Sequence, residues 1–292
     1  MPNPQFTANF STFEAAVADR YIVENEIGRG SRATVYLGRD ARNNEPVAIK
    51  VLRADLASAL DSSRFLNQIR KAAEIRHPGI VTFLYAGEAA GRLFCVRPFL
   101  EGETLRSRLA RERTLPLADA LTIAREVAEA LGHAHANDVL HKDVNPENIL
   151  LSESRALLLD LGLSRAISRS IDETMTGSGL TIGTPEYMSP EHASGGAEMD
   201  ARADLYSLGC VLYEMLAGQP PFSGGPPHAL LIRTLKERPV PIATLRDSIP
   251  ADVEKAIDRM LEKHRGNRYS SASDLIEALT TREAGDGGRE TG

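Results

Sequence analysis

Two glycines and a lysine within the first fifty residues have the types and spacing needed to hold a phosphate group. Gly28 and Gly30 lie between two short β-branched segments, and Lys50 follows the apolar run Val47–Ile49. Glycine lets the backbone approach an anionic ligand and point its N–H groups at phosphate oxygens. A glycine pair alone is more typical of a hairpin turn, but a lysine in this context is a good candidate for one aimed at phosphates. The expected phosphate-binding loop consists of Ile27, Gly28, Arg29, Gly30 and Ser31.

A second set of polar residues, between positions 141 and 160, could move a proton and bind a metal ion. Asp143 lies between His141 and Asn148, and Asp160 precedes a Leu-Gly pair. Carboxylate and amide oxygens are hard ligands of the kind that Mg²⁺ prefers. Either aspartate could instead cap a turn. The presence of Asn148 near both aspartates favours a catalytic site over two unrelated turns.

In this order, the motifs resemble those of a protein kinase catalytic domain, and the resemblance extends over residues 21–279. The segment His141–Asn148 resembles the catalytic loop, and Asp160 with its Leu-Gly neighbours resembles the metal-binding triplet. Ser189–Glu191 resembles the end of the activation segment, and Asp204 and Arg268 fit two buried anchors of the helical lobe. The segments Ile182–Glu191 and Asp204–Gly209 are most similar to the bacterial Hanks-type serine/threonine kinases.

The resemblance implies an α+β fold of two lobes, a small antiparallel five-stranded sheet with one helix and then a larger, mostly helical lobe. The hydrophobic pattern agrees with this order of elements. The expected strands are residues 21–27, 34–38, 47–52, 80–86 and 92–97. The expected helices include 62–75, 203–217, 251–262, 273–280 and a buried one near 117–134. The expected domains are a lead-in with a short helix at 1–20, a nucleotide-binding lobe at 21–98, a catalytic lobe at 99–282 and a disordered tail at 283–292.

The resemblance also implies ATP and Mg²⁺ as cofactors and assigns roles to individual residues. Asp143 would orient the substrate hydroxyl and accept its proton, and Lys50 and Asn145 complete the expected catalytic set. Asn148 and Asp160 would bind Mg²⁺. The expected nucleotide-binding residues beyond the loop are Val35, Ala48 and Leu150 around the adenine, Lys50 at the phosphates, and the backbone of Pro98 and Leu100 at the adenine edge. His141 is expected to be structural, with its ring packed beneath Leu161 and bonded toward Asp204.

Four positions depart from the kinase pattern. The third loop glycine is Ala33, and Gln68 occupies the helix position where a glutamate would pair with Lys50. A charge-assisted hydrogen bond contributes about 1.5–3 kcal/mol and a neutral one about 0.5–1.5 kcal/mol. The conformation in which this helix pairs with Lys50 should therefore be populated about tenfold less. Asn145 replaces a lysine, and Arg97 replaces an apolar residue of the nucleotide pocket.

Arg97 has two competing interpretations. A buried guanidinium without a partner is costly, so Arg97 must find an anion or reach solvent. In one hypothesis it compensates for Asn145 by pairing with Asp160 or with a phosphate. In the other it fills the nucleotide pocket and excludes ATP.

The expected function is transfer of the ATP γ-phosphoryl group to serine or threonine hydroxyls of a protein substrate. The alternative is a pseudokinase that binds a nucleotide or a partner without turnover, which Gln68, Arg97 and Asn145 favour. A small-molecule kinase is disfavoured because residues 183–191 resemble a peptide-docking loop. Candidate autophosphorylation sites are Thr174, Thr176, Ser178 and Thr181, and Lys142 could pair with a phosphate there.

Composition limits the other classes of function. The 292 residues carry 34 Lys and Arg against 40 Asp and Glu, a net charge of −6, whereas a protein that coats nucleic acid is usually basic. The two cysteines, Cys95 and Cys210, lie in apolar runs and indicate buried thiols in a reducing cytoplasm. No run is long enough to span a membrane, and the first residues lack the pattern of a signal peptide.

Overall fold

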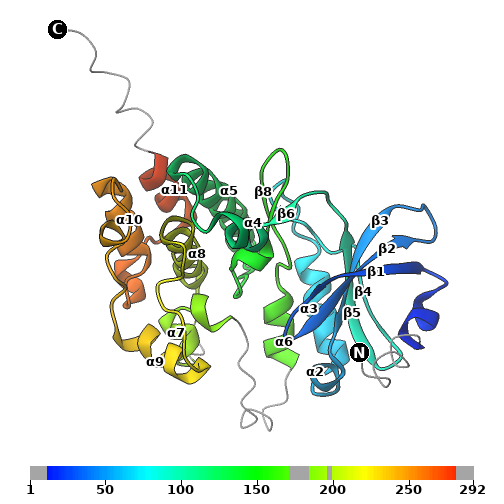
Figure 1. The fold of residues 1–292 in the computed structure, drawn as a ribbon. Helices are drawn as coiled ribbons and strands as arrows, with labels where there is room; N and C mark the ends of the chain where they lie inside the picture. Colours follow the sequence, from blue (N-terminus) through cyan, green and yellow to red (C-terminus); the bar gives the residue numbers. More distant parts are fainter. Residues whose placement is uncertain (1–11, 171–183, 196–198, 281–292) are drawn as a thin grey trace. The chain divides into compact units, whose positions relative to one another are not determined.

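The computed structural model describes residues 12–170, 184–195 and 199–280. The chain divides into two compact units that each combine segments from distant parts of the sequence (Figure 1). The first unit contains residues 1–76, 81–101 and 160–180, and the second contains residues 77–80, 102–159 and 181–292. Within the described ranges, no helix has the length and apolarity that a membrane-spanning segment requires.

The first unit is built on an antiparallel five-stranded sheet in the order β1-β2-β3-β5-β4. Its strands are β1 (Tyr21–Arg29), β2 (Ala33–Asp40), β3 (Pro46–Leu52), β4 (Tyr85–Ala89) and β5 (Arg92–Pro98). The prediction of a strand over 80–86 is wrong for residues 80–84. Ile80 forms only an isolated parallel bridge with Leu158, and the Thr82 hydroxyl donates to the Ile75 carbonyl (3.0 Å). Ile80, Val81 and Phe83 are apolar and buried like strand residues, but Leu84 is 58% exposed, and its N–H donates to the Val96 carbonyl on β5 (2.8 Å) without extending β4.

One face of the sheet carries the predicted nucleotide-binding side chains. Lys50 on β3 lies opposite Val35 on β2 and opposite Cys95 on β5. Ala48, two residues before Lys50, lies opposite Arg97. Because directly opposed residues of an antiparallel pair share a face, as do alternate residues of a strand, all five side chains lie on the same side of the sheet.

The opposite face is apolar and is covered by a short helix at residues 12–17. Phe13 and Val17 from this helix are 0% and 4% exposed and belong to the same core cluster as Phe94. The rings of Phe13 and Phe94 meet edge to face, with their centroids 5.3 Å apart. Nearby, the Arg20 guanidinium lies 3.5 Å from the centroid of the Tyr85 ring. The segment expected as a lead-in thus forms part of the core of the first unit.

Two helices that contact each other flank the nucleotide-binding elements of the first unit. Helix α3 (Ser62–Ala72) begins after Asp61, whose carboxylate accepts the Arg64 backbone N–H (3.0 Å), and ends three residues before the predicted limit. Helix α6 (Leu163–Ser170) packs against α3 through buried apolar residues at 163, 166 and 167. The helices expected from the sequence do not include residues 163–170, so α6 is an addition to them. The unit also contains α2 (Ala54–Ser58).

The second unit is mostly helical. Helices α5 (Leu117–Ala136) and α8 (Ala201–Ala217) contact each other and are buried along most of their length, as their two-sided apolar pattern predicts. A small antiparallel sheet contains β6 (Glu103–Thr104), β7 (Ile149–Leu151) and β8 (Ala156–Leu158). The remaining elements are α4 (Leu105–Glu112), η1 (Pro146–Asn148), η3 (Pro185–Tyr187), α7 (Pro190–Ala193), α9 (Pro227–Lys236), η4 (Ile242–Thr244), α10 (Ala251–Met260), η5 (Arg265–Asn267) and α11 (Ala272–Thr280).

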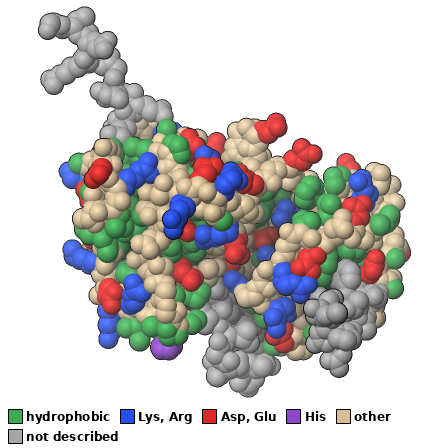
Figure 2. Space-filling model, in the orientation of Figure 1, with side chains coloured by type: hydrophobic (Ala, Val, Ile, Leu, Met, Phe, Trp, Pro, Cys, Tyr) green, Lys and Arg blue, Asp and Glu red, His purple; other side chains and the backbone are tan. Residues whose placement is uncertain are grey.

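Charged side chains of both signs are mixed on one face of the molecule (Figure 2). On the face drawn in Figure 2, lysine and arginine side chains lie among aspartate and glutamate side chains. This mixing agrees with the small net charge of −6.

Candidate active site

An ion pair between Lys50 and Asp160 is central to the site in the first unit. The Lys50 amine donates to Asp160 Oδ2, although the two residues are 110 positions apart in the sequence. Their side chains are 22% and 7% exposed, so water screens the pair only in part. Asp160 has a left-handed backbone (φ 58°), and Gly162 beside it has φ 80°. A Cβ on Gly162 would lie 2.5 Å from the Ala72 Cβ on α3, so this turn requires glycine.

Arg97 lies against the same carboxylate. Its Nε is 3.9 Å from Asp160 Oδ1, and its Nη1 donates weakly to the Pro98 carbonyl (3.4 Å). The Arg97 side chain is 14% exposed. Of the two interpretations of Arg97, this geometry is the one that pairs it with Asp160.

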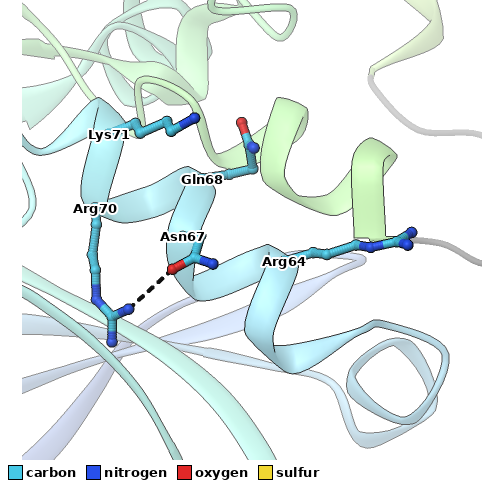
Figure 3. Close-up of a pocket in the computed structure, with 5 residues that line it drawn as sticks. All are labelled: Arg64, Asn67, Gln68, Arg70 and Lys71. Atoms are coloured by element: carbon cyan, nitrogen blue, oxygen red, sulfur yellow. Dashed lines mark hydrogen bonds between the residues drawn. The ribbon is translucent and has the colours of Figure 1, made fainter.

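Gln68 does not replace the expected glutamate as a partner of Lys50. Within the described parts of the chain, the Gln68 side chain makes no hydrogen bond, and the ion pair of Lys50 goes to Asp160. Figure 3 shows Gln68 extending from α3 toward α6. It lines a surface hollow of about 590 Å³ together with Arg64, Asn67, Arg70 and Lys71. The three basic side chains of this hollow, Arg64, Arg70 and Lys71, are exposed.

The glycine loop forms a tight turn between β1 and β2. Gly28 lies opposite Val35, and the Gly30 N–H donates to the Ala33 carbonyl (2.9 Å). The Arg29 side chain pairs with Glu26 through its Nε (2.8 Å), so this cation is held on β1. Of the other expected nucleotide-binding residues, Ile27, Ser31, Pro98 and Leu100 belong to the first unit and Leu150 to β7 of the second.

In the second unit, Asp143 is tied to Thr184 and two asparagines. Asp143 Oδ1 accepts the backbone N–H (3.2 Å) and the hydroxyl (3.1 Å) of Thr184. The Asn145 amide donates to the Asp143 carbonyl (3.0 Å) and to the Thr184 hydroxyl oxygen (3.3 Å). The Asn148 amide donates to the Asp143 carbonyl as well (2.8 Å). Sequence reasoning did not single out Thr184, for which the only signal was its place in the segment Gly183–Glu191.

Asp204 on α8 holds the backbone that carries Asp143. Its Oδ1 accepts the Lys142 N–H (2.8 Å), and its Oδ2 accepts the His141 N–H (2.9 Å). Oδ2 also lies 2.8 Å from His135 Nε2. Burial alone would raise the pKa of Asp204, but the hydrogen bond and charge of His135 and the contact with His141 outweigh it and lower the pKa below its ordinary value.

The expected role of the His141 ring is wrong in one respect. The ring does not bond to Asp204: its Nε2 contacts the Leu159 carbonyl (2.8 Å), and its Nδ1 accepts the Asp143 N–H (3.2 Å). His135 makes the ring contact with Asp204 instead, from the last turn of α5. The sequence around His135 carries no signal for this contact.

The two expected anchors of the helical unit are confirmed as buried. Asp204 is 1% and Arg268 is 2% exposed. Arg268 makes two hydrogen bonds to the Glu191 carboxylate, at 2.7 and 2.8 Å. Burial favours a raised pKa for Glu191, but the Arg268 hydrogen bonds and charge lower it. This bidentate pair fixes the end of the segment that contains Thr184.

The residues expected to bind a metal supply hard oxygens. Asp160 is a nearly buried carboxylate, and the Asn148 amide nitrogen is used by the Asp143 carbonyl, which leaves the amide oxygen as its acceptor. Leu159, the residue before Asp160, donates its N–H to the Asn148 carbonyl (2.9 Å). Mg²⁺ prefers oxygen ligands, so each of these two oxygens is of the kind that it binds. The described residues contain no cluster of three or more acidic, histidine or cysteine ligands.

The architecture and these side chains define a protein kinase domain, and the chain belongs to that family. The sequence model of the protein kinase domain matches residues 21–279. The match begins after the helix at 12–17.

Comparison with curated proteins places the chain among bacterial kinases. It is 39% identical over 267 residues to serine/threonine-protein kinase PknB of Mycobacterium leprae, which covers 89% of this chain and 42% of that protein. It is 38% identical over 272 residues to PknB of Mycobacterium tuberculosis, covering 90% and 43%. It is 35% identical over 267 residues to pkn2 of Myxococcus xanthus, covering 89% and 32%. The chain therefore spans less than half the length of these relatives.

A solved structure shares the fold. The PknI kinase domain of Mycobacterium tuberculosis superposes with a TM-score of 0.71 at 27% identity, covering 89% of this chain and 94% of that one. The α+β fold expected from the sequence, with a five-stranded sheet, a helix and a larger helical part, is confirmed by this match and by the observed elements.

Proposed function

We propose that this chain is the catalytic domain of a serine/threonine protein kinase that transfers the ATP γ-phosphoryl group to protein hydroxyls. The observation that carries the proposal is the ion pair of Lys50 with Asp160 on the sheet face that also holds Val35 and Ala48. The names of the bacterial relatives support the same substrate class. We also propose that the domain works in the cytoplasm, where ATP is present and the buried thiols of Cys95 and Cys210 stay reduced.

Each unit contributes residues to phosphoryl transfer, which depends on positioning and charge neutralisation. Lys50 would hold the ATP phosphates against the glycine loop. Asn148 and Asp160 would hold Mg²⁺, which when bound neutralises charge on the phosphates. Asp143 would orient the substrate hydroxyl and accept its proton.

Asn145 stands where the family pattern has a lysine, and we assign it a positioning role. Its amide bridges the Asp143 carbonyl and the Thr184 hydroxyl, and Thr184 in turn donates to Asp143 Oδ1. Asn145 thereby fixes the general base without adding a positive charge. Its side-chain oxygen also accepts the Glu147 N–H (2.9 Å), which begins η1.

Autophosphorylation of the purified chain with Mg·ATP tests the proposal. Wild type should incorporate phosphate, and Asp143→Asn should lower the rate by about 10²–10⁴-fold because it removes the general base. The candidate acceptors Thr174, Thr176, Ser178 and Thr181 lie outside the described residues, so peptide mass spectrometry must locate the phosphate. No incorporation in either protein, together with retained nucleotide binding, would favour the pseudokinase alternative.

A further inference from the structure

Two cations share one carboxylate in the first unit. Lys50 is hydrogen-bonded to Asp160 Oδ2, and Arg97 places its Nε 3.9 Å from Asp160 Oδ1. The three side chains are 22%, 14% and 7% exposed for Lys50, Arg97 and Asp160. Charges at this depth are screened less than charges on the surface. Arg97 is therefore coupled electrostatically to whatever else binds Asp160.

Among the described residues, no second anion pairs with these two cations. In the described part of the chain, the ion pairs of Lys50 and of Arg97 both go to Asp160. Gln68 on α3 is neutral where a glutamate would relieve Asp160 of Lys50. Cys95, opposite Lys50 on β5, is also neutral, because burial raises the pKa of its thiol well above the ordinary value.

We propose that Arg97 is a positioning residue that holds the Asp160 carboxylate in the nucleotide-free domain and raises the Mg²⁺ concentration needed for nucleotide binding. This inference rests on the proposed function, in which Asp160 binds Mg²⁺. A divalent cation at Asp160 must weaken the pair with Arg97, and the two cations also repel each other. The long aliphatic stem of Arg97 lets its guanidinium turn toward solvent when a metal ion binds. Arg97 therefore lowers the affinity of the site for Mg²⁺ but does not exclude the ion.

The Mg²⁺ dependence of mant-ADP binding, followed by fluorescence on the purified chain, measures this effect directly. The Mg²⁺ concentration that gives half-maximal binding at fixed mant-ADP (the Mg²⁺ midpoint) should fall about fivefold in Arg97→Met and in Arg97→Gln. This is the effect expected from removing one partly exposed charge pair. Two variants are used so that poor folding of one leaves the other informative. Arg92→Met is the matched control, because Arg92 lies on the same strand about 16 Å from Arg97. Its midpoint should equal that of wild type.

Two results would overturn the role of Arg97. One is an unchanged midpoint in both Arg97 variants. The other is a gain of mant-ADP affinity in the Arg97 variants that is as large in EDTA as in Mg²⁺, which would mean that Arg97 obstructs the nucleotide itself.

Asp160→Asn separates this inference from the proposed function. If Asp160→Asn loses its Mg²⁺ dependence while the Arg97 variants behave as wild type, only the role of Arg97 is refuted. If Asp160→Asn keeps the wild-type midpoint, Asp160 is no metal ligand, and the inference and the proposed metal site are both refuted.

Discussion

Replacing Asp204 with asparagine should damage the catalytic loop, because asparagine has nearly the shape of aspartate but one acceptor oxygen fewer. The carboxylate accepts three donors: the Lys142 N–H on Oδ1, and the His141 N–H and His135 Nε2 on Oδ2. Asparagine keeps one oxygen and puts an NH₂ group in place of the other. At least one buried N–H then faces another donor, whichever way the amide is turned.

The size of the effect follows from these bonds. A buried donor left without an acceptor costs about 1–3 kcal/mol, and the charge assistance of the remaining bonds is lost as well. The expected loss in free energy of unfolding is therefore about 3 kcal/mol. Lys142 has a left-handed backbone (φ 65°), which this carboxylate helps to hold. Its relaxation would move Asp143, and a displacement near 1 Å costs about 100-fold in kcat/KM.

Urea unfolding and phosphorylation kinetics on the same preparations give the two readouts. His135→Leu is the matched control, because it removes one donor from Asp204 and leaves both backbone bonds in place. It should cost about 1 kcal/mol and change kcat/KM little. An Asp204→Asn protein within about 0.5 kcal/mol of wild type, with unchanged kcat/KM, would refute the claim that Asp204 holds the loop.

Three further outcomes are expected. Phe13→Ala should lower the free energy of unfolding by about 3–5 kcal/mol, because it removes a fully buried ring that packs on Phe94; a loss below about 1 kcal/mol in denaturant melts would contradict this packing. Gln68→Glu should raise initial phosphorylation rates by up to about tenfold, because a carboxylate can form a charge-assisted bond with Lys50; equal or slower rates would count against it. Burial and the charge of the neighbouring His133 lower the pKa of His77, so the folded chain resists a proton that the unfolded chain accepts below about pH 6.5. Stability should therefore fall as the pH drops from about 7 to 5, and His77→Gln should flatten that slope in thermal melts; an unaltered slope would exclude His77 as a source.

Much of the fold could be predicted because its signals are local. The strands around Lys50 are short β-branched runs between turn residues, and α5 and α8 have apolar residues on two sides. Helix α6 was not predicted, although Leu163, Ala166 and Ile167 have helical spacing. The Ser/Thr-rich sequence that follows it hid this short apolar pattern. A strand was predicted over the apolar residues Ile80, Val81 and Phe83 because an apolar pattern alone cannot reveal whether a strand ladder forms.

The site residues likewise fall into those that local sequence motifs reveal and those that they do not. Lys50, Asp143 and Asp160 could be named because each lies in a short motif with chemical meaning. The roles of Thr184 and His135 could not, because each depends on a hydrogen bond to a residue 41 or 69 positions away in the sequence. Neither the spacing nor the type of these residues contains that information.

The central claim is that Lys50 and Asp160 together bind the nucleotide for phosphoryl transfer. It is tested most directly by the intact mass of phosphatase-treated chain after incubation with Mg·ATP, compared between wild type and a folded Lys50→Met protein. Added phosphate in wild type and none in Lys50→Met is the predicted result. Equal phosphate in both proteins would contradict it.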